Sequence, residues 1–152
     1  MSAKVVVVFD TNVLIPLAVP TGRSQSTRLL SRLRAAGHLV AISQPMIQEL
    51  AEKMRTKKSV RDWLEMTDEE IEQFISDLPA ILGTEPLPGN VSMPGAVKAD
   101  PKDDKIIAAA VEAAASYVVS EDPHLLKLGE WRGIKIMTRK GLMTELDRLG
   151  MP

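Results

Sequence analysis

The sequence predicts an α/β fold in which helices cover both faces of a central parallel sheet of about five strands. Short apolar, β-branched segments alternate along the chain with segments whose apolar residues recur at helical spacing. Such alternation is typical of parallel strands joined by right-handed helical crossovers. The chain has 152 residues, which fits one domain, so we expect residues 1–152 to form a single domain with its own core.

The elements of the N-terminal half have local signals. Lys4–Phe9 is apolar and β-branched, as in a strand buried on both faces, and Asp10 interrupts it. Ser43–Pro45 combines a capping residue with an early proline, and Thr67 and Glu70 have the spacing of a capping box. The expected elements are a strand at Lys4–Phe9, a helix at Ser24–Ala36, a strand at His38–Ile42, a helix that begins at Ser43–Pro45, a helix from Thr67 to about Leu78 and a weak strand at Pro79–Leu87.

The C-terminal half begins after a stretch rich in proline and glycine between Glu85 and Pro101, which we expect to be a loop. Asp100 and Pro101 then have the types preferred at the N-cap and the first position of a helix. The remaining expected elements are a helix from Pro101 through Ala114, a strand at Ser116–Ser120, a short helix at His124–Leu128, a strand at Ile134–Met137 and a last helix at Lys140–Leu149.

The composition excludes several classes of protein. The sequence has no cysteine and two widely separated histidines, so a bound metal would be held by oxygen atoms. No apolar run approaches the ~20 residues of a membrane span, and the first residues lack a secretory pattern. We therefore expect a cytoplasmic protein without a membrane segment. An aromatic content of 3% argues against recognition of bases by stacking on a platform of rings.

The net charge of −1 gives no overall attraction for nucleic acid, but basic side chains cluster locally. Such a cluster either contacts phosphates or is a solvated helix face balanced by nearby acids, and the sequence leaves both readings open. The two clusters are Arg23, Arg28, Arg32 and Arg34, and Lys53, Arg55, Lys57, Lys58 and Arg61.

Four acidic residues lie where a predicted strand ends or near the start of a predicted helix. They are Asp10, Glu49, Asp104 and Asp122. The carboxyl ends of parallel strands share one edge of a sheet, and ligands of α/β sheets bind there. The four acids can therefore meet despite their separation in sequence. Each also has an ordinary structural reading as a turn residue, a helix cap or a solvent-facing helix residue.

The motifs around these acids resemble those of the PIN-domain nucleases, in the same order and over nearly the whole chain. Asp10–Asn12 ends the first strand, and Glu49 lies in the helix that follows the second strand. Asp103–Ala110 places acids just before an Ile-Ala helix, and Val118–Asp122 is a strand that ends in serine and aspartate. Each motif is weak alone, whereas four in register with the predicted elements are specific.

The resemblance implies a three-layer α/β/α sandwich, a ribonuclease activity that depends on Mg²⁺ or Mn²⁺, and frequent membership of VapC-type toxin–antitoxin pairs. It also implies an antitoxin protein as partner and a homodimer. Among the residues, it implies metal binding and catalysis by Asp10, Glu49, Asp104 and Asp122, with help from Asn12 and Ser120. We add Asp103 as an accessory acid, and from the basic clusters we expect phosphate contacts to RNA by Arg23, Lys53, Arg55 or nearby basic residues. Spacing favours Asp104 over Asp103 as the third acid, and helical geometry does not decide between them.

The chemistry of such a site suits these residue types. Mg²⁺ and Mn²⁺ prefer carboxylate and water oxygens, and Mg²⁺ usually takes one or two carboxylates and keeps several waters. Two other functions are compatible with the sequence. One is a catalytically idle PIN-like module that binds a partner protein. The other is a metal-dependent phosphatase, although Asp10–Asn12 lacks the second aspartate of the aspartate-nucleophile phosphatases.

Overall fold

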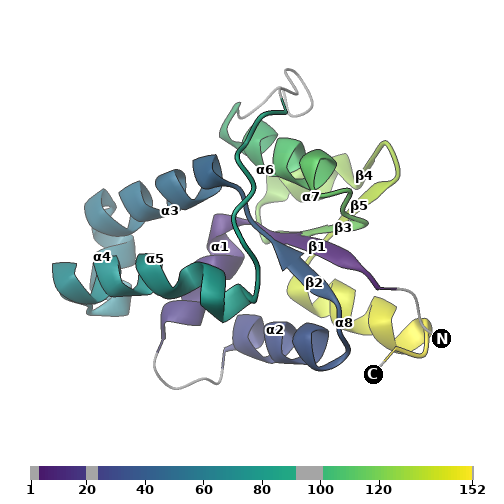
Figure 1. Cartoon of the computed structure of the whole chain (residues 1–152), viewed down its shortest axis with the longest axis horizontal. Coiled ribbons are helices and arrows are strands. Elements are labelled where there is room, and N and C mark those ends of the chain that lie inside the picture. The colour runs from purple at the N-terminus through teal and green to yellow at the C-terminus, as the bar shows by residue number, and fades with distance from the viewer. Residues whose placement is uncertain (1–3, 20–23, 92–100, 152) are drawn as a thin grey trace.

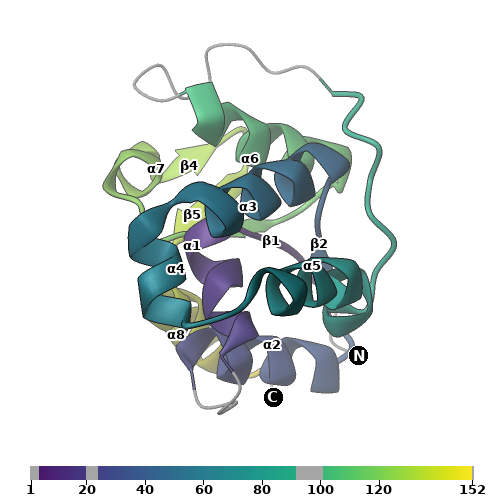
Figure 2. The same ribbon diagram turned by 90° about the vertical axis from the view of Figure 1, so that its left-hand side faces the viewer.

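The computed structural model describes residues 4–19, 24–91 and 101–151, and for residues 101–104 it describes the backbone alone. Within these ranges the chain forms a five-stranded sheet between two layers of helices (Figures 1 and 2). The predicted α/β/α architecture is therefore confirmed. None of the described helices has both the length and the apolar character needed to cross a membrane.

The sheet is parallel except at one edge. Its strand order is β2-β1-β3-β5-β4, with parallel pairing everywhere except between β5 and β4. The interior strand β1 contributes Val7, Val8 and Phe9, whose side chains are fully buried. The strands are β1 (Val6–Phe9), β2 (Leu39–Ala41), β3 (Tyr117–Val119), β4 (Glu130–Trp131) and β5 (Ile134–Met137).

Helices cover both faces of this sheet. In Figure 2, α6 lies above the sheet, where it contacts β1 and β3, and α2 and α8 pack together below it. Helix α3 packs against α6 and α5, and α5 also contacts β2. The helices are α1 (Thr11–Leu14), the 3-10 helix η1 (Ile15–Ala18), α2 (Gln25–Ala35), α3 (Gln44–Thr56), α4 (Lys58–Leu64), α5 (Asp68–Leu82), α6 (Pro101–Glu112), α7 (Pro123–Leu128) and α8 (Arg139–Arg148).

The predicted helix starts are confirmed where the structure describes them. The Ser24 and Ser43 side chains cap α2 and α3 by accepting a backbone N–H three residues later. Thr67 and Glu70 form the complete capping box of α5. Helix α6 begins at Pro101 as predicted, whereas the N-cap assigned to Asp100 lies outside the described residues.

The weak strand predicted at Pro79–Leu87 is wrong. Helix α5 continues through Pro79 to Leu82 and ends at Gly83, which has a left-handed φ of 76°. Leu78 and Leu82 continue the buried helical stripe of α5, so burial outweighs the helix-breaking tendency of the proline. Leu87 forms only an isolated parallel bridge with Ser43.

Several elements have no counterpart in the sequence prediction. The basic segment after α3 contains the helix α4, which is absent from the predicted elements. The two-residue strand β4, at one edge of the sheet, was not predicted, and it pairs antiparallel with β5. Helix α6 ends at Glu112 rather than at Ala114, because Ala114 adopts a left-handed φ of 54°. Elements this short have too few residues to show a period.

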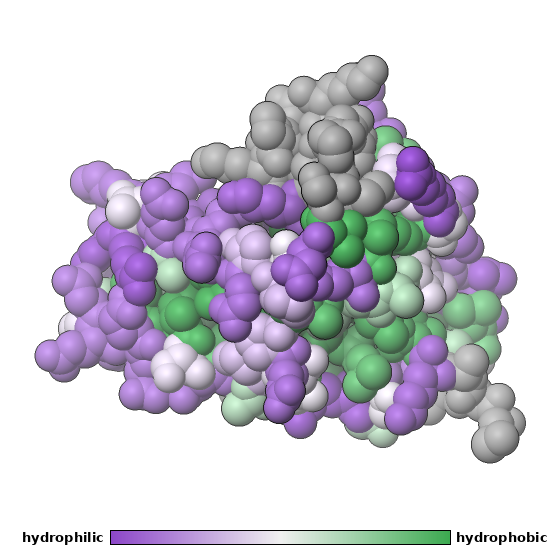
Figure 3. All heavy atoms as spheres, turned by 45° about the horizontal axis from the view of Figure 1, so that its top comes forward, coloured by the Kyte–Doolittle hydropathy of each residue, from purple (hydrophilic) through white to green (hydrophobic). Residues whose placement is uncertain are grey.

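Apolar side chains are exposed in parts of the face that Figure 3 shows. In Figure 3 an apolar area lies over α6 and its neighbours, within a largely hydrophilic surface. A cavity of about 290 Å³ opens between the end of α6 and the β4–β5 hairpin. There the Arg132 guanidinium lies 4.3 Å from the centre of the Trp131 ring. The residues that line the cavity are Ala110, Val111, Ala114, Ala115, Trp131, Arg132 and Ile134.

Candidate functional site

Asp10 is a buried carboxylate at the carboxyl end of β1. Its backbone N–H donates to the Val119 carbonyl at 2.9 Å, which holds it beside the end of β3. Its side chain is 5% exposed. Oδ1 accepts the Thr11 N–H at 2.7 Å and so caps α1, while Oδ2 accepts the Ser120 hydroxyl at 2.7 Å and the Asn12 amide at 3.3 Å. The carboxylate is therefore fixed in orientation by three donors.

The groups around Asp10 have opposite effects on the pKa of its carboxyl. Burial raises the pKa of the Asp10 carboxyl, and the negative charge of Asp122 raises it further. Hydrogen bonds from Ser120 and the Thr11 N–H, together with the positive charge of Lys53, lower the pKa and offset part of this rise. The net pKa lies above 3.8, so the ionised carboxylate is destabilised by its site and would be stabilised by a nearby cation.

Ser120 joins Asp10 to the second acid of the site. The Ser120 hydroxyl is fully buried, donates to Asp10 and accepts the Asp122 N–H at 2.9 Å. Asp122 caps α7 by accepting the His124 N–H at 2.8 Å, and its side chain is 26% exposed. We call Asp10 and Asp122 the acid pair. One member is buried and the other is accessible from solvent.

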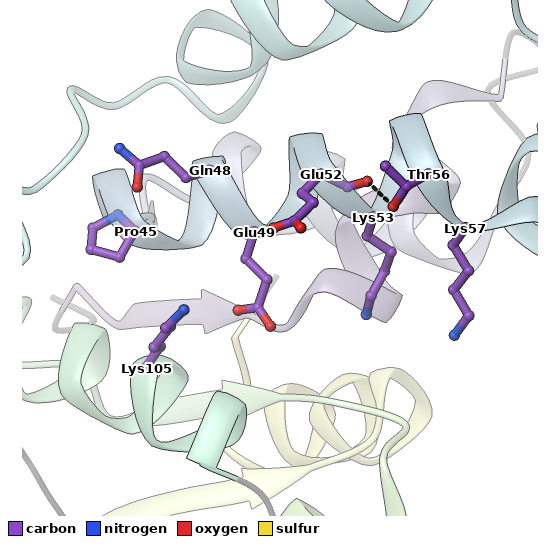
Figure 4. A pocket seen from close by; sticks show the side chains of 8 residues that line it. All are labelled: Pro45, Gln48, Glu49, Glu52, Lys53, Thr56, Lys57 and Lys105. Atoms are coloured by element: carbon purple, nitrogen blue, oxygen red, sulfur yellow. Dashed lines mark hydrogen bonds between the residues drawn. The ribbon is translucent and has the colours of Figure 1, made fainter.

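Glu49 lies in a cavity next to the acid pair. In Figure 4 its carboxylate extends from α3 toward α6, and Lys53, Lys57 and Lys105 point into the same space. The Lys53 ammonium, which lines this cavity, donates to the Thr11 hydroxyl at 2.8 Å and so connects the cavity to the turn after β1. We call it the Glu49 cavity; its volume is about 530 Å³ and its lining residues are Pro45, Gln48, Glu49, Glu52, Lys53, Thr56, Lys57 and Lys105.

The structure brings together four of the residues singled out in the sequence. Asp10 and Asn12 follow β1, Ser120 and Asp122 follow β3, and hydrogen bonds connect them. Glu49 lines the adjacent cavity. The acids Asp103 and Asp104 fall in the first turn of α6, and their side chains lie outside the described residues, as does Arg23.

The two remaining basic candidates have partners inside the protein. Arg55 forms a double hydrogen bond with Glu72 of α5, at 2.5 and 2.8 Å, and Lys53 is bound to Thr11. Sequence reasoning did not find these partners, nor the roles of Thr11 and Lys105 as neighbours of the acids. No local pattern signals the Lys53–Thr11 and Arg55–Glu72 contacts, because each joins elements that are distant in sequence.

The donors that the structure brings together fit a hard divalent cation. The Asp10 carboxylate accepts the Ser120 hydroxyl at 2.7 Å and lies close enough to Asp122 to feel its charge, and Mg²⁺ is commonly held by one or two carboxylates and several waters. Among the side chains that the structure describes, no group of three or more acids or histidines is close enough to hold a metal. Among the described acids, Asp10 and Asp122 would hold such a cation. The sequence places Asp103 and Asp104 in the first turn of α6.

Comparison with known proteins identifies the family. The family model described as PIN domain matches residues 6–124, which is well over half of the chain and includes both members of the acid pair. No curated protein matches the chain. Since the family match and the α/β/α fold agree, the chain belongs to the PIN-domain family, whose members are generally nucleases that hydrolyse nucleic acids.

Proposed function

We propose that this protein is a metal-dependent endoribonuclease that hydrolyses phosphodiester bonds of RNA. The observation that supports this most directly is the acid pair: a buried Asp10 joined through the Ser120 hydroxyl to an accessible Asp122, at the carboxyl edge of the sheet of a PIN domain. Ligands of parallel α/β sheets bind at this edge.

The acids have distinct roles in this proposal. Asp10 and Asp122 hold Mg²⁺ or Mn²⁺ together with Glu49 and Asp104, and Asp103 is the alternative to Asp104. A bound divalent cation supplies a water of lowered pKa and neutralises charge on the leaving oxygen. Ser120 and Asn12 keep the Asp10 oxygens in a fixed orientation by donating to Oδ2. In this way the carboxylate stays in place when no cation is bound.

The substrate strand passes over the Glu49 cavity. Lys57 and Lys105 line this cavity and are placed to contact phosphates, whereas Lys53 acts from within by holding Thr11. Of the basic residues proposed from sequence, Arg55 is occupied by Glu72, so we assign it a structural role in joining α3 to α5. Arg23 remains a proposed RNA contact.

A nuclease assay tests the proposal. Purified protein is incubated with defined RNAs in the presence of Mg²⁺, of Mn²⁺ and of a chelator, and the products are separated on a gel. Cleavage should require metal and should be abolished in Asp10→Asn and Asp122→Asn. The control Asp77→Asn removes an exposed carboxylate on α5 and should cleave normally. Circular dichroism verifies that each variant is folded.

This assay, together with hydrolysis of phosphate monoesters and calorimetry of metal binding, separates the rival functions. Cleavage that persists in both variants, or that resists the chelator, would remove the proposed mechanism. Hydrolysis of small phosphate monoesters without cleavage of RNA would indicate a phosphatase. An absence of metal binding by calorimetry would indicate an idle module that binds a partner through its apolar surface. Single-stranded DNA of the same sequence tests the preference for RNA.

The cellular role is proposed from the resemblance to VapC-type proteins. In this proposal the protein is the toxin component of a toxin–antitoxin pair, acts in the cytoplasm as a homodimer and is neutralised by an antitoxin protein. The apolar area over α6 and the cavity beside Trp131 offer a surface for such partners (Figure 3). Induced expression should arrest growth, and Asp10→Asn should relieve the arrest. Light scattering measures the oligomeric state.

A further inference from the structure

A second basic cavity lies between the first turns of α2 and α8. We call it the α2–α8 cavity; its volume is about 180 Å³ and it is lined by Gln25, Arg28, Arg139, Lys140 and Met143. Three of these five side chains are cationic and none is acidic. The Glu49 cavity, by contrast, is lined by two glutamates as well as by lysines.

The helix geometry adds to the positive character of this cavity. Helices α2 and α8 run in the same direction. Their first turns line the same cavity, and Arg32 near the end of α2 contacts the Met143 carbonyl and Asp147 farther along α8. Gln25 is the first residue of α2, and Arg139 is the first of α8. The positive ends of two helix dipoles therefore meet at the cavity, where they favour an anion.

A chain of hydrogen bonds connects this cavity to the acid pair. The Arg139 guanidinium donates to Glu121 at 2.9 Å and to the Ser26 hydroxyl at 3.1 Å. The Glu121 backbone N–H donates to Asn12 at 3.2 Å, and Asn12 donates to Asp10. These bonds place the α2–α8 cavity near the acid pair and fix the orientation of the Arg139 guanidinium.

The strand order separates the two cavities. The Glu49 cavity is built on α3, which follows β2, and the α2–α8 cavity is built partly on α8, which follows β5. The acid pair follows β1 and β3, which lie between β2 and β5 in the sheet. An RNA strand that crosses this edge of the sheet would therefore meet cations on both sides of the acid pair.

Lys140 is the cation best placed to bind a ligand. Its side chain is exposed, and within the described part of the chain it forms no ion pair. Arg139 shares its charge with Glu121, so its main effect is to shape the wall of the cavity. Met143 supplies an apolar surface next to these cations. A nucleotide, with a phosphate group on a sugar that also carries a base, matches this combination of charge and apolar contact.

We propose that the α2–α8 cavity binds a phosphodiester of the substrate strand, on the side of the cleaved bond away from the Glu49 cavity. This inference rests on the proposed nuclease function. Lys140 contacts the phosphate, and Arg139 is a positioning residue that fixes the cavity relative to the acid pair.

Salt-dependent binding tests the inference without requiring cleavage. Labelled single-stranded RNA of about ten nucleotides is titrated with the Asp10→Asn protein by fluorescence anisotropy, between about 50 and 400 mM salt. Lys140→Met should weaken binding several-fold and should reduce the slope of log K against log salt by about 0.7, the value for one phosphate contact on a single strand. Lys4→Met, at the opposite end of β1, is the matched control and should leave the slope unchanged.

Shortening the RNA distinguishes a defined subsite from a general field. The loss of RNA affinity caused by Lys140→Met should disappear once the RNA is too short to reach the α2–α8 cavity. Inorganic phosphate added to Lys140→Met should not restore its binding of RNA. Equal effects of Lys140→Met and Lys4→Met, or equal losses at every length, would overturn the subsite while leaving the nuclease proposal intact. A wild-type protein that neither binds nor cleaves RNA would overturn both.

Discussion

Asp10 has an environment that works against its own charge. It is buried at the end of a central strand, and yet the hydroxyl of Ser120, the Thr11 N–H and the Lys53 charge all favour its ionised form. Burial is the largest of these influences, so the pKa of Asp10 is raised. A site that holds a carboxylate at such a cost to stability is typical of a functional residue.

This environment predicts how the stability of the protein depends on pH. Below the unfolded-state pKa near 3.8, Asp10 is protonated in both states and its burial carries no charge penalty. Because the folded-state pKa is raised, stability is lost as the pH rises through that value. The variant Asp10→Asn lacks this loss, so its melting temperature relative to wild type should increase with pH.

The measurement is thermal unfolding in chelator from about pH 3 to about pH 8. Every other group titrates in both proteins, so the difference in melting temperature isolates Asp10. The difference should grow across the window that begins near pH 3.8 and should level off above the raised pKa. A difference that shrinks as the pH rises would show that the hydrogen bonds outweigh burial at Asp10.

At the scale of elements, the bond between Lys53 and Thr11 joins α3 to the turn that follows β1. The ammonium nitrogen and the hydroxyl oxygen are 2.8 Å apart, and the two residues are 42 positions apart in sequence. This contact connects the Glu49 cavity, which Lys53 lines, to the residue after Asp10. It also places a positive charge close to Asp10.

A double-mutant cycle measures this connection. Lys53→Met and Thr11→Val should each destabilise the protein, and their effects should couple by about 0.5–3 kcal/mol because both remove one hydrogen bond. Urea unfolding in chelator provides the free energies. Thr144→Val, an exposed threonine of α8, is the control partner, and its effect should add to that of Lys53→Met. Full additivity of Lys53→Met with Thr11→Val would mean that the bond contributes nothing.

At the scale of the whole molecule, the pairing of β1 with β3 brings the acidic side chains of Asp10 and Asp122 near each other. A divalent cation that binds only the folded protein must raise its stability. At a free concentration of 100 times the dissociation constant, the gain is about 2.7 kcal/mol. For a domain of this size, such a gain raises the melting temperature by several degrees.

Thermal unfolding with and without Mg²⁺ or Mn²⁺ tests this prediction. Wild type and the control Asp77→Asn should show the same rise in melting temperature, and Asp10→Asn should show much less. An unchanged wild-type melting temperature at millimolar metal would count against a metal centre at the acid pair. A rise that persists in Asp10→Asn would place the cation elsewhere on the protein.

The sequence by itself determined the fold class, most helices and strands and the family. The apolar run of β1, the capping box at Thr67 and the helix start at Pro101 are local patterns, and the structure reproduces them. Local patterns suffice there because a strand or a cap depends on residues a few positions apart. The sequence also marked Asp10, Asn12, Ser120 and Asp122 as candidates.

Only the tertiary structure decided how these residues meet. Ser120 and Asp10 are 110 positions apart, and their hydrogen bond exists because β1 and β3 are neighbours in the sheet. Tertiary packing also brings Arg55 to Glu72 of α5, and this contact is why we no longer propose Arg55 as an RNA-binding residue. The α2–α8 cavity likewise exists only because α2 and α8 pack together. Burial also overrode the local signal at Pro79, where the apolar stripe of α5 continues past the proline. Contacts between distant segments depend on packing in three dimensions, which no local period or cap encodes.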